Sequence, residues 1–195
     1  MSLSQGPLIV LDTCVLLAGS LRRVLFALAK AGCFQPIWSQ VIGDEWQRNA
    51  ARLWQLEANE VAKQWRDMQI TFPQACVGEI ERYKAGLRYS DAKDWHVIAA
   101  ARSARDVYDA PSATVVTYNT RDFNRSELRR LQLYVQNPDD YLSRLWQEFA
   151  PLVREELRAM AFDQGPCTPE GSRAFVSGRL KRERLFRLNN LYLAK

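Results

Sequence analysis

Short runs of apolar residues that end in polar ones organise the N-terminal two thirds of this chain. The run Leu8–Leu11 has four apolar residues and leads directly into Asp12, which is typical of a fully buried strand in a parallel sheet. Thr114–Thr117 repeats the pattern and also ends in polar residues. Two further short strands are predicted, over Phe34–Trp38 and Leu131–Val135.

Helical patterns separate these strands. Leu21–Ala31 places its leucines and a valine on one face, and Cys76–Tyr83 fits either a short strand or a helix. Other helices are predicted after Ser39 as N-cap, over Ala50–Gln69, after Ser90 as N-cap, from Pro138 towards Met160, and around Leu180–Leu191 in the tail. The alternation predicts an α/β fold with a parallel sheet of four or five strands and helices on both sides.

Composition narrows the class of protein. No apolar run approaches the ~20 residues of a membrane span, and Met1–Gly6 lacks the basic start and apolar core of a signal peptide. We therefore expect a cytoplasmic protein without membrane contact. The four cysteines form no CxxC pair, which favours free thiols over a disulfide or zinc site. With one histidine in the chain, a His-rich metal site is disfavoured, so chemistry must depend on carboxylates.

The net charge of +5 is concentrated at the C-terminus. From Gly171 onward there are seven basic residues and one acid, Glu183, which gives this tail +6 and leaves −1 for the rest. A basic tail is typical of a solvated face or of contact with a polyanion. We predict a domain over residues 1–142 and a helical extension over residues 143–195, with a linker inside the extension at Gly165–Pro169, before the basic tail.

Acidic residues recur at one predicted edge of the sheet. Asp12 ends the first strand, Glu45 lies in the first turns of the helix after Trp38, and Asp94 starts a later helix. Asn119 and Asp122 follow the strand Thr114–Thr117. The carboxyl ends of parallel strands and the N-termini of the following helices lie on the same side, so these groups can converge.

Converging carboxylates repel one another unless a cation neutralises them. Mg²⁺ and Mn²⁺ accept carboxylate and water oxygens as ligands. Such ions activate water and stabilise charge on a phosphodiester, which needs no histidine. The acids therefore indicate a metal-dependent hydrolase.

Four segments resemble one family. They are LIVLDTCVL (Leu8–Leu16), DEWQRN (Asp44–Asn49), DWHVIAAA (Asp94–Ala101) and VVTYNTRDF (Val115–Phe123). In order and spacing they are similar to the PIN-domain nucleases, and within them to the toxins of VapBC-type toxin–antitoxin systems. The resemblance covers residues 8–142 and implies a Rossmann-like sheet and a Mg²⁺- or Mn²⁺-dependent endoribonuclease. It also implies an RNA substrate and a cognate antitoxin protein, and it leaves a homodimer open.

The resemblance also assigns roles. Asp12, Glu45 and Asp94 match the family's first three acids, and both catalysis and metal binding are expected of them. Many members carry an Asp soon after the fourth-strand Thr. This chain has Asn119 there, as the candidate fourth metal ligand, and Asp122 three residues later, as the candidate fourth catalytic acid. The family often has Asn or another small polar residue at the position of Cys14.

Other residues are candidates for contact with RNA or for structural roles. The substrate-binding candidates are Arg48, Thr117 and Arg121, with Thr117 alternatively holding a neighbouring carboxylate. Asp91 is expected to be an acid of the cap region. His96 lies two positions after Asp94, about 200° around a regular helix, and is expected to face away from the site.

Every acid of the set has a structural alternative as a helix cap or turn former. Two alternative functions also stay open. A non-catalytic PIN-like module would use the same fold to bind RNA or protein. A metal-dependent phosphatase on another doubly wound fold would need a nucleophilic Asp.

Overall fold

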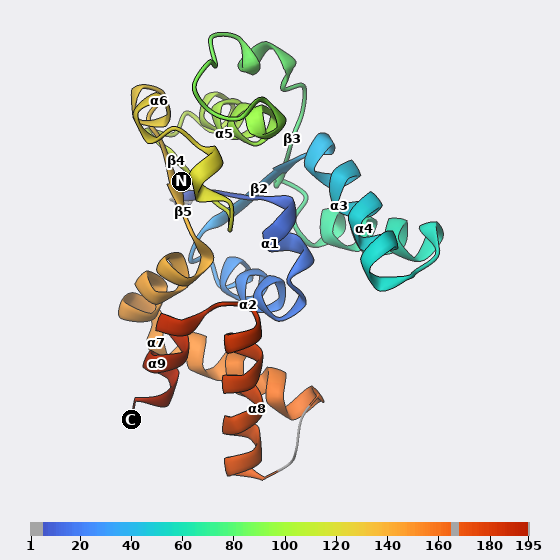
Figure 1. The fold of residues 1–195 in the computed structure, drawn as a ribbon, viewed down its shortest axis with the longest axis vertical. Helices are drawn as coiled ribbons and strands as arrows, with labels where there is room; N and C mark the ends of the chain where they lie inside the picture. Colours follow the sequence, from blue (N-terminus) through green and yellow to red (C-terminus); the bar gives the residue numbers. More distant parts are fainter. Residues whose placement is uncertain (1–5, 165–167, 195) are drawn as a thin grey trace, which may run out of the picture.

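The computed structural model describes residues 6–164 and 168–194 and contains a five-stranded parallel sheet flanked by helices (Figure 1). The strand order is β3-β2-β1-β4-β5, so β1 (Leu8–Leu11) is central. The predicted α/β class, with a Rossmann-like parallel sheet and C-terminal helices, is confirmed. The predictions made for residues 1–5, for most of the linker and for the thiol of Cys167 lie outside the described residues.

The predicted strands are present within a residue or two of their expected bounds. Leu8 of β1 pairs with Gln35 on one side and Ala113 on the other, and all four residues of β1 are buried. The ambiguous segment Cys76–Tyr83 contains a two-residue edge strand followed by a 3₁₀ turn. The 3₁₀ turn is η1 (Glu81–Lys84). The other strands of the sheet are β2 (Gln35–Ser39), β3 (Cys76–Val77), β4 (Ala113–Val116) and β5 (Leu133–Gln136).

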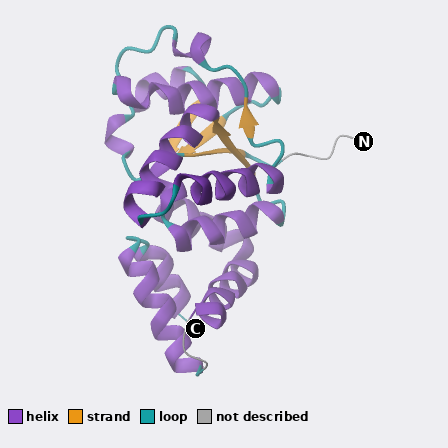
Figure 2. Ribbon diagram, turned by 90° about the vertical axis from the view of Figure 1, so that its right-hand side faces the viewer, coloured by secondary structure: helices purple, strands orange, loops and turns teal. Residues whose placement is uncertain are grey.

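Helices cover both faces of the sheet (Figures 1 and 2). On one face α5 (Trp95–Val107) packs on β1, β2 and β4, and its alanines permit this close approach. On the other face α2 (Gly19–Lys30) contacts β2 and α7 (Pro138–Gln164). The other helical elements are α1 (Thr13–Leu17), α3 (Gln40–Trp54), α4 (Ala58–Thr71), η2 (Ala92–Asp94), η3 (Thr120–Asp122), α6 (Arg125–Arg130), α8 (Pro169–Arg182) and α9 (Phe186–Leu193).

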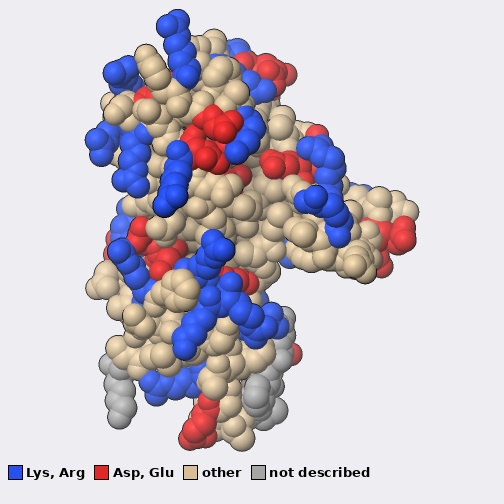
Figure 3. Space-filling model, in the orientation of Figure 1, with Lys and Arg blue, Asp and Glu red and all other residues tan. Residues whose placement is uncertain are grey.

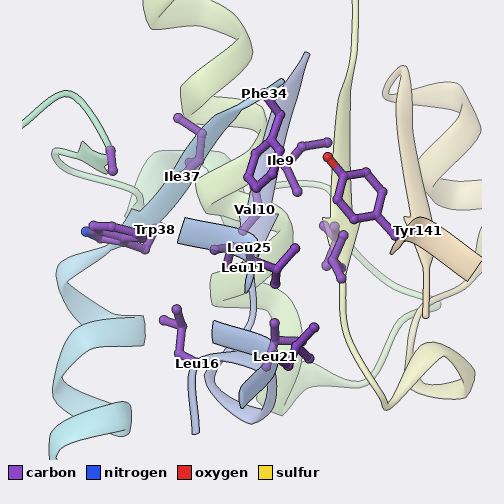
Figure 4. Close-up of a cluster of buried hydrophobic side chains, with 14 of the residues drawn as sticks. Ile9, Val10, Leu11, Leu16, Leu21, Leu25, Phe34, Ile37, Trp38 and Tyr141 are labelled. Carbon is purple, nitrogen blue, oxygen red and sulfur yellow. The ribbon is translucent and has the colours of Figure 1, made fainter. Parts of the chain in front are cut away.

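The core is built around the central strand (Figure 4). Ile9, Val10 and Leu11 have no exposed surface, so each side of the strand is covered. Phe34 and Tyr141 meet edge to face beside them, with ring centroids 5.7 Å apart. A strand buried on both faces cannot alternate polar with apolar residues, which explains its unbroken apolar run.

The helix predicted continuously over Ala50–Gln69 is wrong. Helix α3 ends at Trp54, and Gln55 adopts a left-handed conformation (φ 53°) that closes it. Aromatic packing explains the turn, because α4 folds back on α3 and packs Trp65 against Trp46. The centroids of the two rings lie 6.0 Å apart. This packing provides more buried surface than continuation of the helix into solvent.

The C-terminal helices share the core of the sheet domain. Buried side chains of α7, α8 and α9 belong to the same hydrophobic cluster as the strands. The predicted boundary between residues 142 and 143 falls inside α7, which bends later, at Phe149, just before Pro151. Within residues 6–164 and 168–194, none of the helices has the length and apolar character that crossing a bilayer requires.

The contact between α3 and α4 makes Gly43 a sensitive position. A Cβ atom at Gly43 would lie 2.2 Å from Cζ2 of Trp65, whose ring is itself packed among aromatics. We expect Gly43→Ala to lower the free energy of unfolding by about 1–3 kcal/mol, measured by urea denaturation. The matched control is Gly178→Ala in α8, where a Cβ meets open space and helix propensity favours Ala by up to ~1 kcal/mol. Equal stability of the two variants would contradict the proposed packing.

Candidate active site

The predicted acids lie at the carboxyl ends of the strands, as expected of a parallel sheet. Asp12 follows β1, Asp94 ends η2 immediately before α5, and Asp122 ends η3 after β4. Glu45 comes from α3, which Ser39 starts by accepting a hydrogen bond from the N–H of Ile42 (3.3 Å). Figure 3 shows acidic side chains gathered on this face, with basic ones beside them.

Asp12 is held by hydrogen-bond donors on both carboxylate oxygens. Its Oδ1 accepts from the N–H of Thr13 (2.7 Å), and its Oδ2 accepts from Thr117 Oγ1 (2.6 Å) and Cys14 Sγ (3.1 Å). Asp12 is also the N-cap of α1 and is almost fully buried. Thr117 has no exposed surface, so its predicted contact with substrate does not fit the structure. Its alternative role, holding a carboxylate, does.

Cys14 supplies a polar contact at the position where the resembled family often has Asn. Burial, followed by the charge of Asp12, raises the pKa of the Cys14 thiol to about 12. The thiol therefore stays protonated at neutral pH and can donate to Asp12. Its sulfur also accepts from the N–H of Tyr118 (3.4 Å), which connects the start of α1 to the residue after Thr117.

The Glu45 carboxylate has two partners, Thr13 and His96, and the sequence did not predict the contact with His96. Thr13 Oγ1 donates to Glu45 Oε2 (2.9 Å), and His96 Nε2 lies 3.2 Å from the same oxygen, without the alignment of a good hydrogen bond. The His96 contact is the main reason that the pKa of Glu45 lies below its usual value, and Thr13 adds to it. Burial opposes protonation of His96, but Glu45 outweighs burial and raises the pKa of the imidazole.

The prediction that His96 faces away from the acids is wrong. It assumed regular helix spacing from Asp94, but Asp94 has φ −100° and ψ 1°, and α5 begins only at Trp95. The 3₁₀ turn before the helix redirects the side chain. The ring is oriented by Nδ1, which lies 2.8 Å from the carbonyl oxygen of Lys93.

Asp94 is the one acid of the set whose buried oxygen lacks a donor. The residue is 8% exposed, and no hydrogen-bond donor of the described residues reaches its Oδ2. Burial, then the charges of Asp12 and Asp122, raise the pKa of Asp94 to about 6. The charges of Asp12 and Asp122 thus act on the buried carboxyl of Asp94, so these three acids of the predicted set lie near one another.

The fourth acidic position is better matched by Asp122 than by Asn119. Asn119 is exposed, and it contacts the site through its backbone: its N–H donates to Thr117 Oγ1 (3.0 Å) and its carbonyl oxygen accepts from the N–H of Asp122 (3.0 Å). Asp122 is half-buried and its charge reaches Asp94. Lys93 Nζ lies 3.4 Å from Asp122 Oδ2 and equally far from Asp91 Oδ2, so it partly neutralises this end of the edge.

The loop that carries Asp91 and Asp94 depends on a residue that sequence reasoning missed. Glu127, the acid in the first turn of α6, is buried and accepts from the backbone N–H groups of residues 88–90 and from the Ser90 hydroxyl (2.7 Å). Burial disfavours its charge, but these hydrogen bonds outweigh burial and lower the pKa of Glu127. Ser90 is therefore not the predicted N-cap, and Asp91 caps the 3₁₀ turn instead by accepting from Lys93 N–H (3.1 Å). An acid in a first helical turn is common, so the sequence offered no specific signal for Glu127.

The two predicted arginines lie at the surface around the site. Arg48 is exposed one turn after Glu45, and its charge helps to lower the pKa of that carboxylate. Arg121 is exposed in η3. Both are accessible to a ligand at this edge.

Carboxylate oxygens of this kind suit a hard divalent cation, but the structure does not already hold the carboxylates in a coordinating arrangement. Within the described ranges, 6–164 and 168–194, no three Asp, Glu, His or Cys side chains form a ready metal cluster. Glu45 is drawn towards Thr13 and His96, and Asp122 towards Lys93. The Oδ2 of Asp94 is nevertheless a buried oxygen that accepts no hydrogen bond from the described residues, and carboxylate oxygens are the ligands that Mg²⁺ and Mn²⁺ prefer. Asp12, Glu45, Asp94 and Asp122 would hold the ion.

The raised pKa of Asp94 predicts a pH-dependent stability. Its pKa of about 6 exceeds the ordinary value of 3.8, so the folded state binds the proton more tightly and loses stability as pH rises from about 4 to 6. Without divalent ions, we expect Asp94→Asn to melt at least about 2 °C above the unaltered chain at pH 8 and to lose this advantage at pH 4. The control is Asp106→Asn, at an exposed position in α5, the helix that follows Asp94. This variant should leave the melting temperature unchanged at pH 8 and at pH 4. An Asp94→Asn advantage that is the same at both pH values would contradict the assignment.

Comparison with known proteins does not identify the family. No family model matches the chain, and neither a curated protein nor a solved structure matches it. The likeness to PIN-domain nucleases therefore depends on the four sequence segments, and the function is a matter for proposal.

Proposed function

We propose that this chain is a Mg²⁺- or Mn²⁺-dependent endoribonuclease of the PIN-domain type. The observation that carries the proposal is the buried, donorless carboxylate of Asp94, whose pKa Asp12 and Asp122 raise. Such an arrangement is unfavourable unless a cation or a proton neutralises it. The sequence resemblance supports the further proposal that the enzyme is a toxin of a type II toxin–antitoxin system. It would act on RNA in the cytoplasm and be held inactive by a cognate antitoxin.

A bound divalent ion would supply an activated water and stabilise the charge that develops on the phosphodiester. Asp12 is the anchor of the site, because three donors fix its carboxylate before any ligand arrives. Fixed ligands reduce the reorganisation needed during reaction.

The other acids differ in their protonation. Glu45, with its pKa lowered by His96, is ionised at neutral pH. Asp94 gives up its proton only near pH 6 unless a cation is present. A proton and the cation therefore compete for Asp94, so at limiting Mn²⁺ the activity should decline as pH falls below about 6.

The surface around the acids can hold the RNA backbone. The exposed guanidinium groups of Arg48 and Arg121 flank the edge, and guanidinium binds phosphate through two hydrogen bonds. Such contacts position a strand without reading its sequence. The RNA that is cut and its cleavage site depend on contacts beyond these two.

Removal of the anchor carboxylate tests the activity. With a labelled single-stranded RNA and Mn²⁺, we expect the unaltered chain to cut and Asp12→Asn to cut at least about 100-fold more slowly, because one fixed charge of the site is removed. EDTA should stop the reaction. The control is Asp67→Asn, an exposed acid on α4, which should retain full activity.

Other outcomes would contradict the nuclease proposal. Equal cleavage by the unaltered chain and Asp12→Asn would show that the activity does not depend on this site. RNA that is bound and left intact with every divalent ion would favour a non-catalytic binding module. Hydrolysis of a small phosphomonoester with RNA left intact would favour a phosphatase.

A further inference from the structure

The connection between α8 and α9 is attached next to the catalytic edge. The Tyr118 hydroxyl donates to the carbonyl oxygen of Glu183 (2.8 Å), and Tyr118 directly follows the residue that holds Asp12. The Glu183 carboxylate accepts from the backbone N–H groups of Ser20 (3.0 Å) and Leu21 (2.7 Å) at the start of α2. The C-terminal extension is therefore fixed at this point by three hydrogen bonds from two parts of the sheet domain.

These hydrogen bonds turn the one acidic side chain of the α8–α9 connection inward and leave its basic side chains exposed. Glu183, the one acid between residues 179 and 187, is turned towards the N-terminus of α2, where the helix dipole favours a negative charge. Lys181, Arg182 and Arg184 are exposed, and together they form what we call the basic elbow. In the described part of the chain, no carboxylate lies within ion-pair distance of any of these three side chains.

The neighbouring arginine behaves differently. Arg187 is ion-paired with Asp140, and its backbone N–H donates to Asp139 (2.8 Å). The basic elbow thus has positive charge that the described part of the protein does not itself neutralise. Unpaired, exposed arginines and lysines of this kind are available to an anionic ligand.

The basic elbow is held in a defined position by the residues on either side of it. Leu180 and Leu185 bracket it and are buried in the common core, and Arg184 itself adopts a left-handed conformation (φ 57°) at the turn. Burial raises the pKa of Tyr118, and the nearby charge of Arg184 opposes that rise. Figure 3 shows the basic side chains of this region on the same face of the molecule as the acids of the sheet edge.

We propose that the basic elbow binds backbone phosphates of the RNA strand on one side of the cleavage position. This inference rests on the proposed nuclease function and adds a substrate-binding surface from outside the sheet domain. The acids of the edge repel a polyanion, so a strand that crosses them needs positive charge nearby. The hydrogen bond from Tyr118 holds this positive charge near the edge. The charge itself lies on the C-terminal extension, which a PIN-like domain ending near residue 142 would lack.

Binding of RNA at different salt concentrations tests the surface. The test variant is Lys181→Gln with Arg182→Gln and Arg184→Gln. The control removes the same charge elsewhere, through Lys63→Gln, Arg66→Gln and Arg158→Gln, all exposed positions on α4 and α7. Binding of labelled single-stranded RNA is measured with Asp12→Asn added to each protein, so that the strand stays intact.

We expect the elbow variant to bind at least about tenfold more weakly at low salt than the control. Its slope of log affinity against log salt concentration should be shallower by about 0.7 for each phosphate that the elbow no longer neutralises. With Asp12 restored, the elbow variant should cut RNA with a raised KM and a largely unchanged kcat. Circular dichroism and thermal melting should show that both triple variants are folded.

Each other result has a definite meaning. If the chain cuts RNA and the two triple variants bind equally, the elbow inference is overturned and the nuclease proposal stands. If the chain neither binds nor cuts RNA, both are overturned. If the elbow variant loses only its binding to a poly-glutamate peptide, the surface serves an acidic protein partner and the RNA assignment is wrong.

Discussion

The position of the Asp12 carboxylate is the constraint on which the candidate site depends. It lies at the end of a central strand with almost no exposed surface, so the backbone that carries it cannot move without disturbing the core. Thr13, Cys14 and Thr117 then fix its two oxygens. A carboxylate that is both buried and satisfied is costly to displace, because its donors would lose their partner inside the protein. The other acids can adjust around this fixed point.

The C-terminal helices are also fixed by the core and by hydrogen bonds near the site. They bury apolar residues in the core of the sheet domain, and they place Glu183 where it meets both Tyr118 and the start of α2. Fold and charge are thereby linked, since the contact that attaches the extension also turns its acid inward. The surface that remains at the elbow is basic and lies on the face of the acids (Figure 3).

The sequence predicted the parts that depend on periodicity and strand ends, and missed those that depend on local backbone geometry. Asp12 and Asp94 could be predicted to converge because parallel strands and their helices share one edge. The approach of His96 to Glu45 could not, because it depends on a 3₁₀ turn that regular helix spacing does not describe. The role of Glu127 could not be predicted for another reason: three of its four hydrogen-bond donors are backbone N–H groups, which the residue types do not reveal.

Direct measurement of Mn²⁺ binding tests the central claim, that these carboxylates form a cation site. Calorimetric titration of the RNA-free chain should show binding that EDTA reverses, together with a rise in melting temperature at saturating metal. Asp94→Asn should weaken this binding at least about tenfold, because a ligand charge is removed, whereas the surface variant Asp106→Asn should bind as the unaltered chain does. Equal Mn²⁺ affinity of the unaltered chain and Asp94→Asn, or no binding to either, would contradict the account.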